Sequence, residues 1–541
     1  MMKKYYKQIF TGLLTILVLA GCKKLDLAPT DRFTELNFWK SSANVNNALN
    51  NVYSRLYTST YYFYNESLSD NAYTRLGVGS GNSDAIASGN FTSSLARFLS
   101  EWDYYYTSIK ASNIFIENID KNTELSEEIK NRMKAEARFA RAFHHFKLMN
   151  WWGDVPLLSN DITPDEAKTI SRTPREEVLS FILTELDAAA QALPAKHQYA
   201  EADRGRITSA AAMALKARVL LYEGNRMQEV ADICEDIMNG TYGNYDLVNT
   251  YSGVFSPQNE YNSEVIWDLQ YVPNLRTWGE YIDFAPVSAG SRGNNLAPTQ
   301  ELVDSYIMLN GKKINEAGSG YDEENPYINR DPRLSQTIVY HGGEWRDANG
   351  NTRTIYIKPG SDPDASAKDE YKPSGQGTAT GYYWKKYYDP TAVAGFNSGL
   401  NLIMIRYAEV LLMYAEAKAS LGQFDEDVWN KTIRRLRARA GFTNNDALNF
   451  PGNAGIEEII RNERRVEFAL EGLRIDDIRR WKIAEDVMNG YAHGAQFEDP
   501  SVDDGYIRAQ FRTFDASKNY LWPIPESERN KNKNLSQNPN Y

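Results

Sequence analysis

The chain has very few of the residues that build disulfides and metal centres. Its 541 residues include two cysteines, Cys22 and Cys234, and five histidines. Two cysteines allow at most one disulfide, and they allow none if Cys22 is modified. Cys234 lies in a helical pattern beside Ile233 and Ile237, so we expect an inert buried thiol. A chain of this length can bury a large core and does not need a disulfide.

The motifs of common catalytic and nucleotide-binding sites are also absent. The sequence has no G-x-S-x-G, P-loop, G-x-G-x-x-G or H-E-x-x-H pattern. His144 and His145 are adjacent in a helical stretch, where neighbours diverge by about 100°, so they do not suit one zinc ion. The acidic loops at 361–370 and 499–505 have oxygen ligands of the kind calcium accepts, but neither matches the EF-hand loop. We therefore expect no catalytic residue, no metal and no cofactor.

Long hydrophobic runs are scarce, and the one near the start is short. Three lysines precede Ile9–Ala20, a mostly apolar stretch of 12 residues. A membrane-spanning helix needs about 20 residues, so this pattern indicates a secretory signal. The tetrapeptide Leu19-Ala20-Gly21-Cys22 matches the lipobox of bacterial lipoproteins, in which the cysteine becomes the lipidated first residue. The alternative is an ordinary signal peptide with an incidental cysteine.

The chain that follows this signal is acidic. The formal net charge of −11 becomes −14 when the three lysines before Cys22 are removed. An acidic protein is unsuited to nucleic acid, and it does not adsorb to an anionic bilayer by charge alone. Attachment to the membrane must then come from the lipid, and stable anchoring takes more than one acyl chain. We divide the chain into a signal peptide at 1–21, a lipidated tether at 22–40 and a single domain at 41–541.

Helical patterns dominate this domain. Small and apolar residues recur at helical spacing in Ala210–Leu221 and again in Val230–Ile237, with glycine breaks at 224 and 240. This predicts a helical hairpin of the tetratricopeptide type. A comparable unit is expected at 405–441, and further helices at 127–150 and 175–193. Long polar inserts separate these units, so we expect a mainly α fold in which helical hairpins form a scaffold with irregular, loop-rich inserts.

The densest cluster of charge lies at Glu463–Trp481. Glu463, Glu467 and Glu471 recur every four residues and would stack along one face of a helix. Arginines are interleaved with them, and a nearby guanidinium lowers the pKa of a carboxyl group. A glycosidase needs a carboxylic acid with a raised pKa, so these glutamates suit a structural ion-pair network better than catalysis.

Aromatic residues are abundant, at 12% of the chain, and tyrosine is the commonest of them. Tyr and Trp combine a flat apolar face with a polar group, which suits stacking on carbohydrate rings. We expect most of them to pack in the helical core, including the cluster Tyr61–Tyr64 beside a predicted helix. Aromatics in the long loops at 59–93 and 241–298 are the better binding candidates, because long loops in a compact domain are usually functional or disordered.

Several segments, in their order and spacing, resemble the SusD/RagB family of outer-membrane nutrient-binding lipoproteins. Each segment is weak alone, but together they cover nearly the whole chain. After the lipobox and Pro29, the segments that carry the resemblance are Asn37–Tyr53, Glu136–Phe143, Trp151–Leu158, Ile207–Gly240, Ala297–Lys312, Asn329–Ile338, Arg406–Ala417, Glu463–Trp481 and Tyr520–Tyr541.

The resemblance implies a SusD-like α-α superhelix of tetratricopeptide-like hairpins with an irregular ligand face. It implies a non-catalytic lipoprotein on the outside of the outer membrane of a Gram-negative bacterium. Such proteins capture glycans and act as a lid on a partner, a SusC-like TonB-dependent barrel transporter. Some relatives take peptides instead, so peptide capture stays an alternative. A third hypothesis is a helical-toroid glycoside hydrolase or lyase, which would release products from a polysaccharide.

Ligand-binding candidates come from the two regions where members of this family often place their contacts. Either set could instead pack within its own loop, because loop aromatics indicate binding without proving it. The first loop contributes Asp70, Asn71, Tyr73 and Arg75, and the second contributes Trp278, Tyr281 and Arg292.

Overall fold

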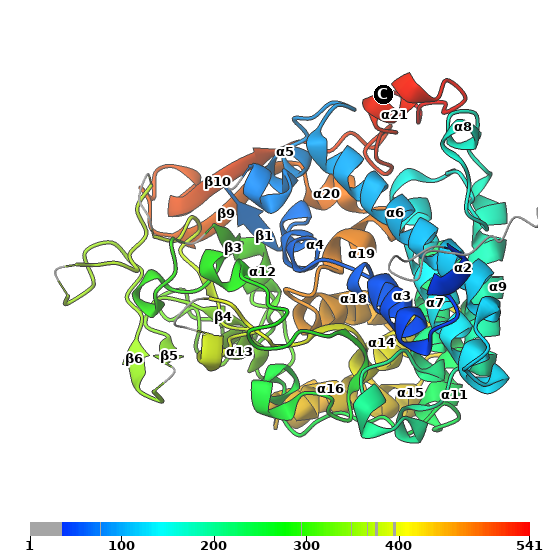
Figure 1. Cartoon of the computed structure of the whole chain (residues 1–541). Helices are drawn as coiled ribbons and strands as arrows, with labels where there is room; N and C mark the ends of the chain where they lie inside the picture. The colour runs from blue at the N-terminus through cyan, green and yellow to red at the C-terminus, as the bar shows by residue number, and fades with distance from the viewer. Residues whose placement is uncertain are drawn as a thin grey trace, which may run out of the picture.

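The computed structural model describes residues 35–541 except 76, 294, 348, 365, 374–376 and 393–395. Helices gather on one side of the molecule, and short strands and long loops fill the other (Figure 1). The prediction of a mainly α fold with loop-rich inserts is confirmed. The predicted signal peptide and most of the tether, with Cys22, lie outside the described residues. Within the described part, no helix is both long and apolar enough to cross a membrane.

A row of long helices forms the scaffold, and each helix packs on the next. Side-chain caps define several starts: Ser126 accepts a hydrogen bond from the Ile129 amide, and Thr208 from the Ala211 amide. Gly224 follows the helix Ser209–Glu223, and its φ of +75° is a conformation that favours glycine. In packing order the row consists of α6 (Ala96–Asn118), α7 (Glu127–Trp152), α9 (Arg175–Ala192), α10 (Ser209–Glu223), α11 (Met227–Met238) and α14 (Tyr407–Ser420).

The helical hairpin predicted at 207–240 is confirmed by α10 and α11. The second predicted hairpin differs in its second half, which is two short helices, α15 (Glu426–Lys431) and α16 (Ile433–Ala440). Thr432 separates them with a non-helical backbone (φ −122°, ψ −90°), and its hydroxyl donates to the Val428 carbonyl at 2.6 Å. Threonine competes for backbone hydrogen bonds in this way, which explains the break.

Short helices and paired strands make up the rest. The remaining α-helices are α2 (Glu35–Phe38), α3 (Ser42–Ser54), α4 (Ser59–Tyr64), α5 (Ser83–Ala87), α8 (Pro164–Ala167), α12 (Gln300–Ser305), α13 (Arg333–Thr337), α17 (Asn445–Leu448), α18 (Ile456–Glu467), α19 (Arg474–Arg480), α20 (Ala484–Val487) and α21 (Glu526–Lys531). The strands form antiparallel pairs: β1 (Ala72–Thr74) with β3 (Leu296–Pro298), β2 (Val265–Leu269) with β8 (Leu402–Arg406), β4 (Ile338–Val339) with β7 (Tyr383–Trp384), β5 (Glu344–Arg346) with β6 (Thr352–Thr354), and β9 (Gly490–Gln496) with β10 (Tyr506–Arg512).

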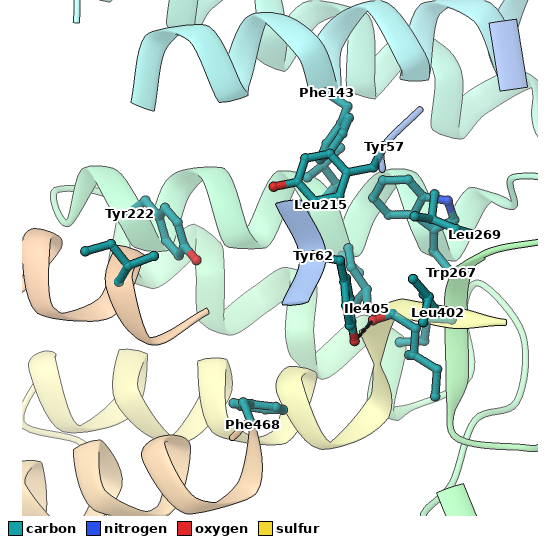
Figure 2. Close-up of a cluster of buried hydrophobic side chains, with 14 of the residues drawn as sticks. Tyr57, Tyr62, Phe143, Leu215, Tyr222, Trp267, Leu269, Leu402, Ile405 and Phe468 are labelled. Carbon is teal, nitrogen blue, oxygen red and sulfur yellow. Dashed lines mark hydrogen bonds between the residues drawn. The ribbon is translucent and has the colours of Figure 1, made fainter. Parts of the chain in front are cut away.

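The core continues from the scaffold into the loop-rich side. Figure 2 shows Phe143 of α7 beside Trp267 of β2, and their ring centroids lie 5.0 Å apart. Tyr62 of α4 is buried in the same region and donates a hydrogen bond to the Ile403 carbonyl at 2.9 Å. The packing role predicted for the Tyr61–Tyr64 cluster is thereby confirmed for Tyr62 and its buried neighbours in α4.

A buried ion network joins the two sides. Arg406 contacts Glu264 at 2.8 Å and both Glu467 and Glu471 at 2.7 Å, and Arg333 contacts Glu467 at 3.0 Å. All five side chains are buried. Burial alone would raise the pKa of Glu467, but the surrounding arginines outweigh burial and hold that pKa well below its usual range. The structural interpretation of this glutamate series is confirmed.

The adjacent histidines and the second cysteine also have packing roles. His144 Nε2 lies 3.0 Å from the Arg55 carbonyl oxygen, and His145 Nδ1 lies 2.9 Å from that of Arg141. Burial lowers the pKa of His144 to about 4 and that of His145 to about 3, so both rings are neutral at physiological pH. Cys234 is buried, and burial raises the pKa of its thiol. An un-ionised buried thiol is inert, as predicted.

Replacing Glu467 by Gln should lower the free energy of unfolding by about 3–5 kcal/mol, because it leaves buried guanidinium groups without their carboxylate. Glu457→Gln is the matched control, since Glu457 lies on the same helix, is exposed, and pairs loosely with Arg461 at 3.8 Å. The control should change stability by less than about 1 kcal/mol. Urea denaturation followed by circular dichroism measures both, and equal effects would contradict the central role of the network.

Candidate ligand-binding face

The two loops predicted to bind ligand meet in the structure. Strand β1 lies in the first loop, and it pairs with β3 at the end of the second loop, so that Tyr73 lies opposite Ala297. The Thr299 hydroxyl donates to the Asp70 carbonyl at 2.6 Å, and the Thr74 hydroxyl donates to the Asn295 carbonyl. Segments more than 200 residues apart therefore form one continuous surface.

Tyr73 and Arg75 lie at the accessible end of β1. Both side chains are half-buried, which leaves part of the tyrosine ring and of the guanidinium in contact with solvent. Arg75 Nη2 donates to the Gly377 carbonyl at 2.7 Å, so this arginine links β1 to the loop at 377. Burial raises the pKa of Tyr73, and its phenol stays a neutral hydrogen-bonding group.

Arg292 is the most exposed of the predicted residues, with 54% of its side chain accessible. Its Nε and Nη2 donate to the two oxygens of Asp283 at 2.7 and 2.9 Å, a bidentate pair that fixes the plane of the guanidinium. Asp283 is in turn held by the Tyr64 hydroxyl, 2.7 Å away. Because Asp283 is buried while Arg292 is not, the pair presents a rigid cationic group at the surface.

Asp70 and Asn71 correct the prediction, because they hold the protein together rather than face solvent. Asp70 is buried, and its carboxylate accepts from Arg474 Nε at 2.8 Å and lies 3.0 Å from Arg465 Nη2. Asn71 is fully buried and donates to Glu66 at 2.7 Å. The partners of Asp70 are roughly 400 residues away in sequence, so no local pattern indicates them.

Trp278 and Tyr281 also lie in the interior. Trp278 is 2% exposed, packs on Phe63 with ring centroids 4.8 Å apart, and donates from its indole to the Leu400 carbonyl at 2.8 Å. Tyr281 is 1% exposed and stacks on Phe396 at 5.9 Å. Neither ring has a free face for a sugar, so their assignment as binding platforms is replaced by a packing role.

Comparison with known proteins agrees with this architecture. Residues 256–541 match the family model described as the SusD family, and residues 25–221 match one described as "Starch-binding associating with outer membrane". The chain belongs to the SusD family. The resemblance noted from the sequence is thereby confirmed.

Individual relatives in the SusD family match over most of their length. The SusD-like protein P2 of Formosa agariphila is 27% identical, and the match covers all of both chains. A solved SusD-like carbohydrate-binding protein from Bacteroides fragilis is 30% identical, covers 92% of this chain and all of its own, and superposes with a TM-score of 0.82. A second SusD-like structure from that species is 28% identical, with 95% of this chain covered and a TM-score of 0.79.

The β9–β10 hairpin adds aromatic groups that the sequence analysis of this SusD-family chain missed. Tyr491 and Phe511 are 41% and 59% exposed, lie opposite each other in the ladder, and have ring centroids 5.1 Å apart. Arg512 of β10 donates to the Ser69 and Ala72 carbonyls at 2.6 and 2.8 Å, which holds the hairpin against the first loop. The alternation of apolar and polar residues over 507–512 was the signal for this strand.

The chemistry of this face is that of binding. It combines a partly open tyrosine ring with guanidinium groups held by protein partners, and the adjoining hairpin carries the exposed aromatic pair. Such groups stack on apolar faces and donate hydrogen bonds to hydroxyl or carboxylate oxygens. Over the described residues, no group of three or more His, Cys, Asp and Glu side chains is placed to hold a metal ion.

The different burial of Trp278 and Tyr73 predicts different effects on stability when each is replaced by alanine. Trp278→Ala should lower the free energy of unfolding by about 3–5 kcal/mol because it opens a cavity in the core. Tyr73→Ala, at a half-buried position, should cost about 1 kcal/mol or less. Thermal unfolding and urea titration measure both variants. A stable Trp278→Ala protein that had lost its ligand would return Trp278 to the list of binding residues.

Proposed function

We propose that this chain is a non-catalytic, cell-surface lipoprotein that captures a glycan and delivers it to a partner TonB-dependent outer-membrane transporter. The observation that carries the proposal is the ligand-binding face, where Tyr73, Arg75 and Arg292 are held on two joined loops with part of each side chain accessible. The carbohydrate-binding description of a relative 30% identical over 92% of the chain supports glycan as the ligand class.

The ionisation of the glutamates at 463–471 supports binding of a glycan without its hydrolysis. A glycosidase needs one carboxylic acid that can donate a proton near neutral pH. In the cluster that the sequence singles out, the pKa values of Glu463, Glu467 and Glu471 are all lowered: burial opposes ionisation, but the arginines and Lys386 outweigh it. These groups stay ionised and buried, so they support a structural role and no proton donor.

The proposed binding mode is stacking combined with hydrogen bonds. A sugar ring would lay its C–H face on Tyr73 or the Tyr491–Phe511 pair, while Arg75 and Arg292 donate to its oxygens. A few such contacts give modest affinity for one sugar unit. A polymer that engages several of them at once binds more tightly, because later contacts form at high effective concentration.

The proposal also includes a location at the outer membrane and delivery of the glycan to a transporter. Lipidation at Cys22 would tether the protein to the outer membrane, and the description "associating with outer membrane" of the matched family model supports that location. The SusC-like transporter partner is proposed from the family resemblance. The lipobox offers a lipid anchor at Cys22, and stable anchoring takes more than one acyl chain.

Affinity electrophoresis tests glycan capture. Residues 23–541 are run through native gels that contain a panel of soluble polysaccharides, and the same mixtures are assayed for released sugars. We expect retardation by one glycan class and no products. Arg292→Ala and Tyr73→Ala should each weaken binding roughly tenfold, the value of one charged hydrogen bond or one stacked ring.

Two control substitutions remove the same side chains elsewhere. Arg435 pairs with Asp246 on the helical side, and Tyr242 is half-buried beyond α11. Arg435→Ala and Tyr242→Ala should leave retardation unchanged. Released sugars would contradict the non-catalytic proposal. Binding of peptides but not of any polysaccharide would favour the peptide-capturing alternative, for which Arg75 and Arg292 offer partners to a carboxylate.

The anchor is tested separately. Cys22→Ala should move the protein expressed in a Gram-negative host from the membrane fraction to the soluble fraction, because acylation needs the cysteine sulfur. Partition into detergent, followed by immunoblotting, measures the change. Glycan retardation of the purified protein should be unaffected. Retention of the variant in the membrane fraction would contradict lipidation at Cys22.

A further inference from the structure

A cavity lies away from the ligand-binding face, between the α9–α10 connection and β2. Its volume is about 340 Å³, enough for a small organic molecule, and a neighbouring cavity of about 500 Å³ shares Arg204, Gly205, Arg206 and Asp268 with it. The connection supplies exposed residues, among them Glu201 and Arg204, so the cavity borders the surface. The β1–β3 pair and the β9–β10 hairpin contribute none of its lining.

The cations in this cavity already have protein partners. Lys196 Nζ donates to the carbonyls of Tyr261, Asn262 and Val265 at 3.1, 2.8 and 3.2 Å. Arg204 pairs with Glu201 at 2.6 Å and lies over the Tyr261 ring at 5.1 Å. The third cation, Arg206, pairs with Glu136 at 3.0 Å. The positive charge that lines the cavity is therefore bound within the protein.

Two acidic residues that line the cavity, Asp268 and Glu260, differ from the two arginines because they have no ion-pair partner among the described residues. Asp268 is buried, Glu260 is half-buried, and among the described residues both have hydrogen-bond partners rather than ion-pair partners. Both are held by Asn401, whose side chain donates to Asp268 at 3.0 Å and whose backbone amide donates to Glu260 at 2.7 Å. Burial raises the pKa of Asp268 to about 7, although Lys196 and Asn401 lower it, and burial also raises the pKa of Glu260.

Aromatic groups complete the lining. Trp267 and Tyr261 both contribute to the cavity wall. The Trp267 indole nitrogen is buried and has no hydrogen-bond partner among the described residues. Two carboxyl groups that make no ion pair with a described residue suit an organic ammonium group, because its charge neutralises theirs and its N–H groups donate to their oxygens. The described acids are not grouped closely enough to hold a metal ion instead.

We propose that the cavity at Asp268 binds a small molecule that carries a primary ammonium group, such as a hexosamine. The ammonium group would donate to Asp268 and Glu260. This site is independent of glycan capture at the ligand-binding face, because the two share no residue.

Isothermal titration calorimetry at neutral pH with the full mature chain tests the site. The probes are glucosamine, N-acetylglucosamine and glucose, which share one ring and differ at a single position. We expect glucosamine to bind at least tenfold more tightly than the other two, since only it carries an ammonium group. Lysinamide is the fourth probe and separates an amino-sugar site, which rejects it, from a general ammonium site, which accepts it.

Asp268→Asn should weaken glucosamine binding at least tenfold while keeping the hydrogen bond from Asn401. Asp232→Asn is the control, because it removes the same charge at an exposed position on α11 outside the cavity. Equal binding of glucosamine and glucose to the unmodified protein, or no binding of any ammonium probe, would overturn the proposal whatever the variants do. Arg292→Ala should leave glucosamine binding intact, which separates this site from the proposed glycan face.

Discussion

The structure depends on the buried ion network around Arg406 and Glu467. Taking charges out of water costs several kcal/mol for each ion, and a single partner rarely repays that cost. Here Arg406 contacts three carboxylates, Glu264, Glu467 and Glu471, and Glu471 also binds Lys386 at 2.6 Å. Glu264 lies just before β2, and Lys386 follows β7. Arg406 ends β8, Glu467 ends α18, and Glu471 lies between α18 and α19. The network therefore fastens the helical scaffold to the loop-rich side.

A similar arrangement continues towards the proposed glycan site. Arg474 and Arg465 hold Asp70 just before β1, β1 pairs with β3, and the loop before β3 carries Arg292 on Asp283. Short strands of three residues would not stay in place alone, because they offer too few hydrogen bonds and too little buried surface. Ion pairs to the helices position them, which is how an irregular loop surface can present side chains with a defined geometry.

The predictions from sequence succeeded where one segment contains its own signal. The α10–α11 hairpin follows from helical spacing of small and apolar residues with a glycine break, and the burial of Cys234 follows from its place in that pattern. They failed where the partner of a residue lies far away. Asp70 looked like a loop acid, yet its arginine is about 400 residues distant, and Trp278 looked like a loop aromatic, yet Phe63 covers its ring. Polarity and loop position cannot report such contacts.

By itself the sequence indicated the family and the helical scaffold, which the structure and the relatives confirm, and it predicts a secretory signal with a lipobox at Cys22. Each of these rests on local periodicity, on a short motif or on the order of segments along the chain. Only the tertiary structure decided which loop residues reach solvent and which carboxylates make no ion pair with a described residue. Asp268 shows the reason: it lies in an ordinary strand pattern, and it makes no ion pair within the described chain because Lys196, Arg204 and Arg206 bind other groups in the fold.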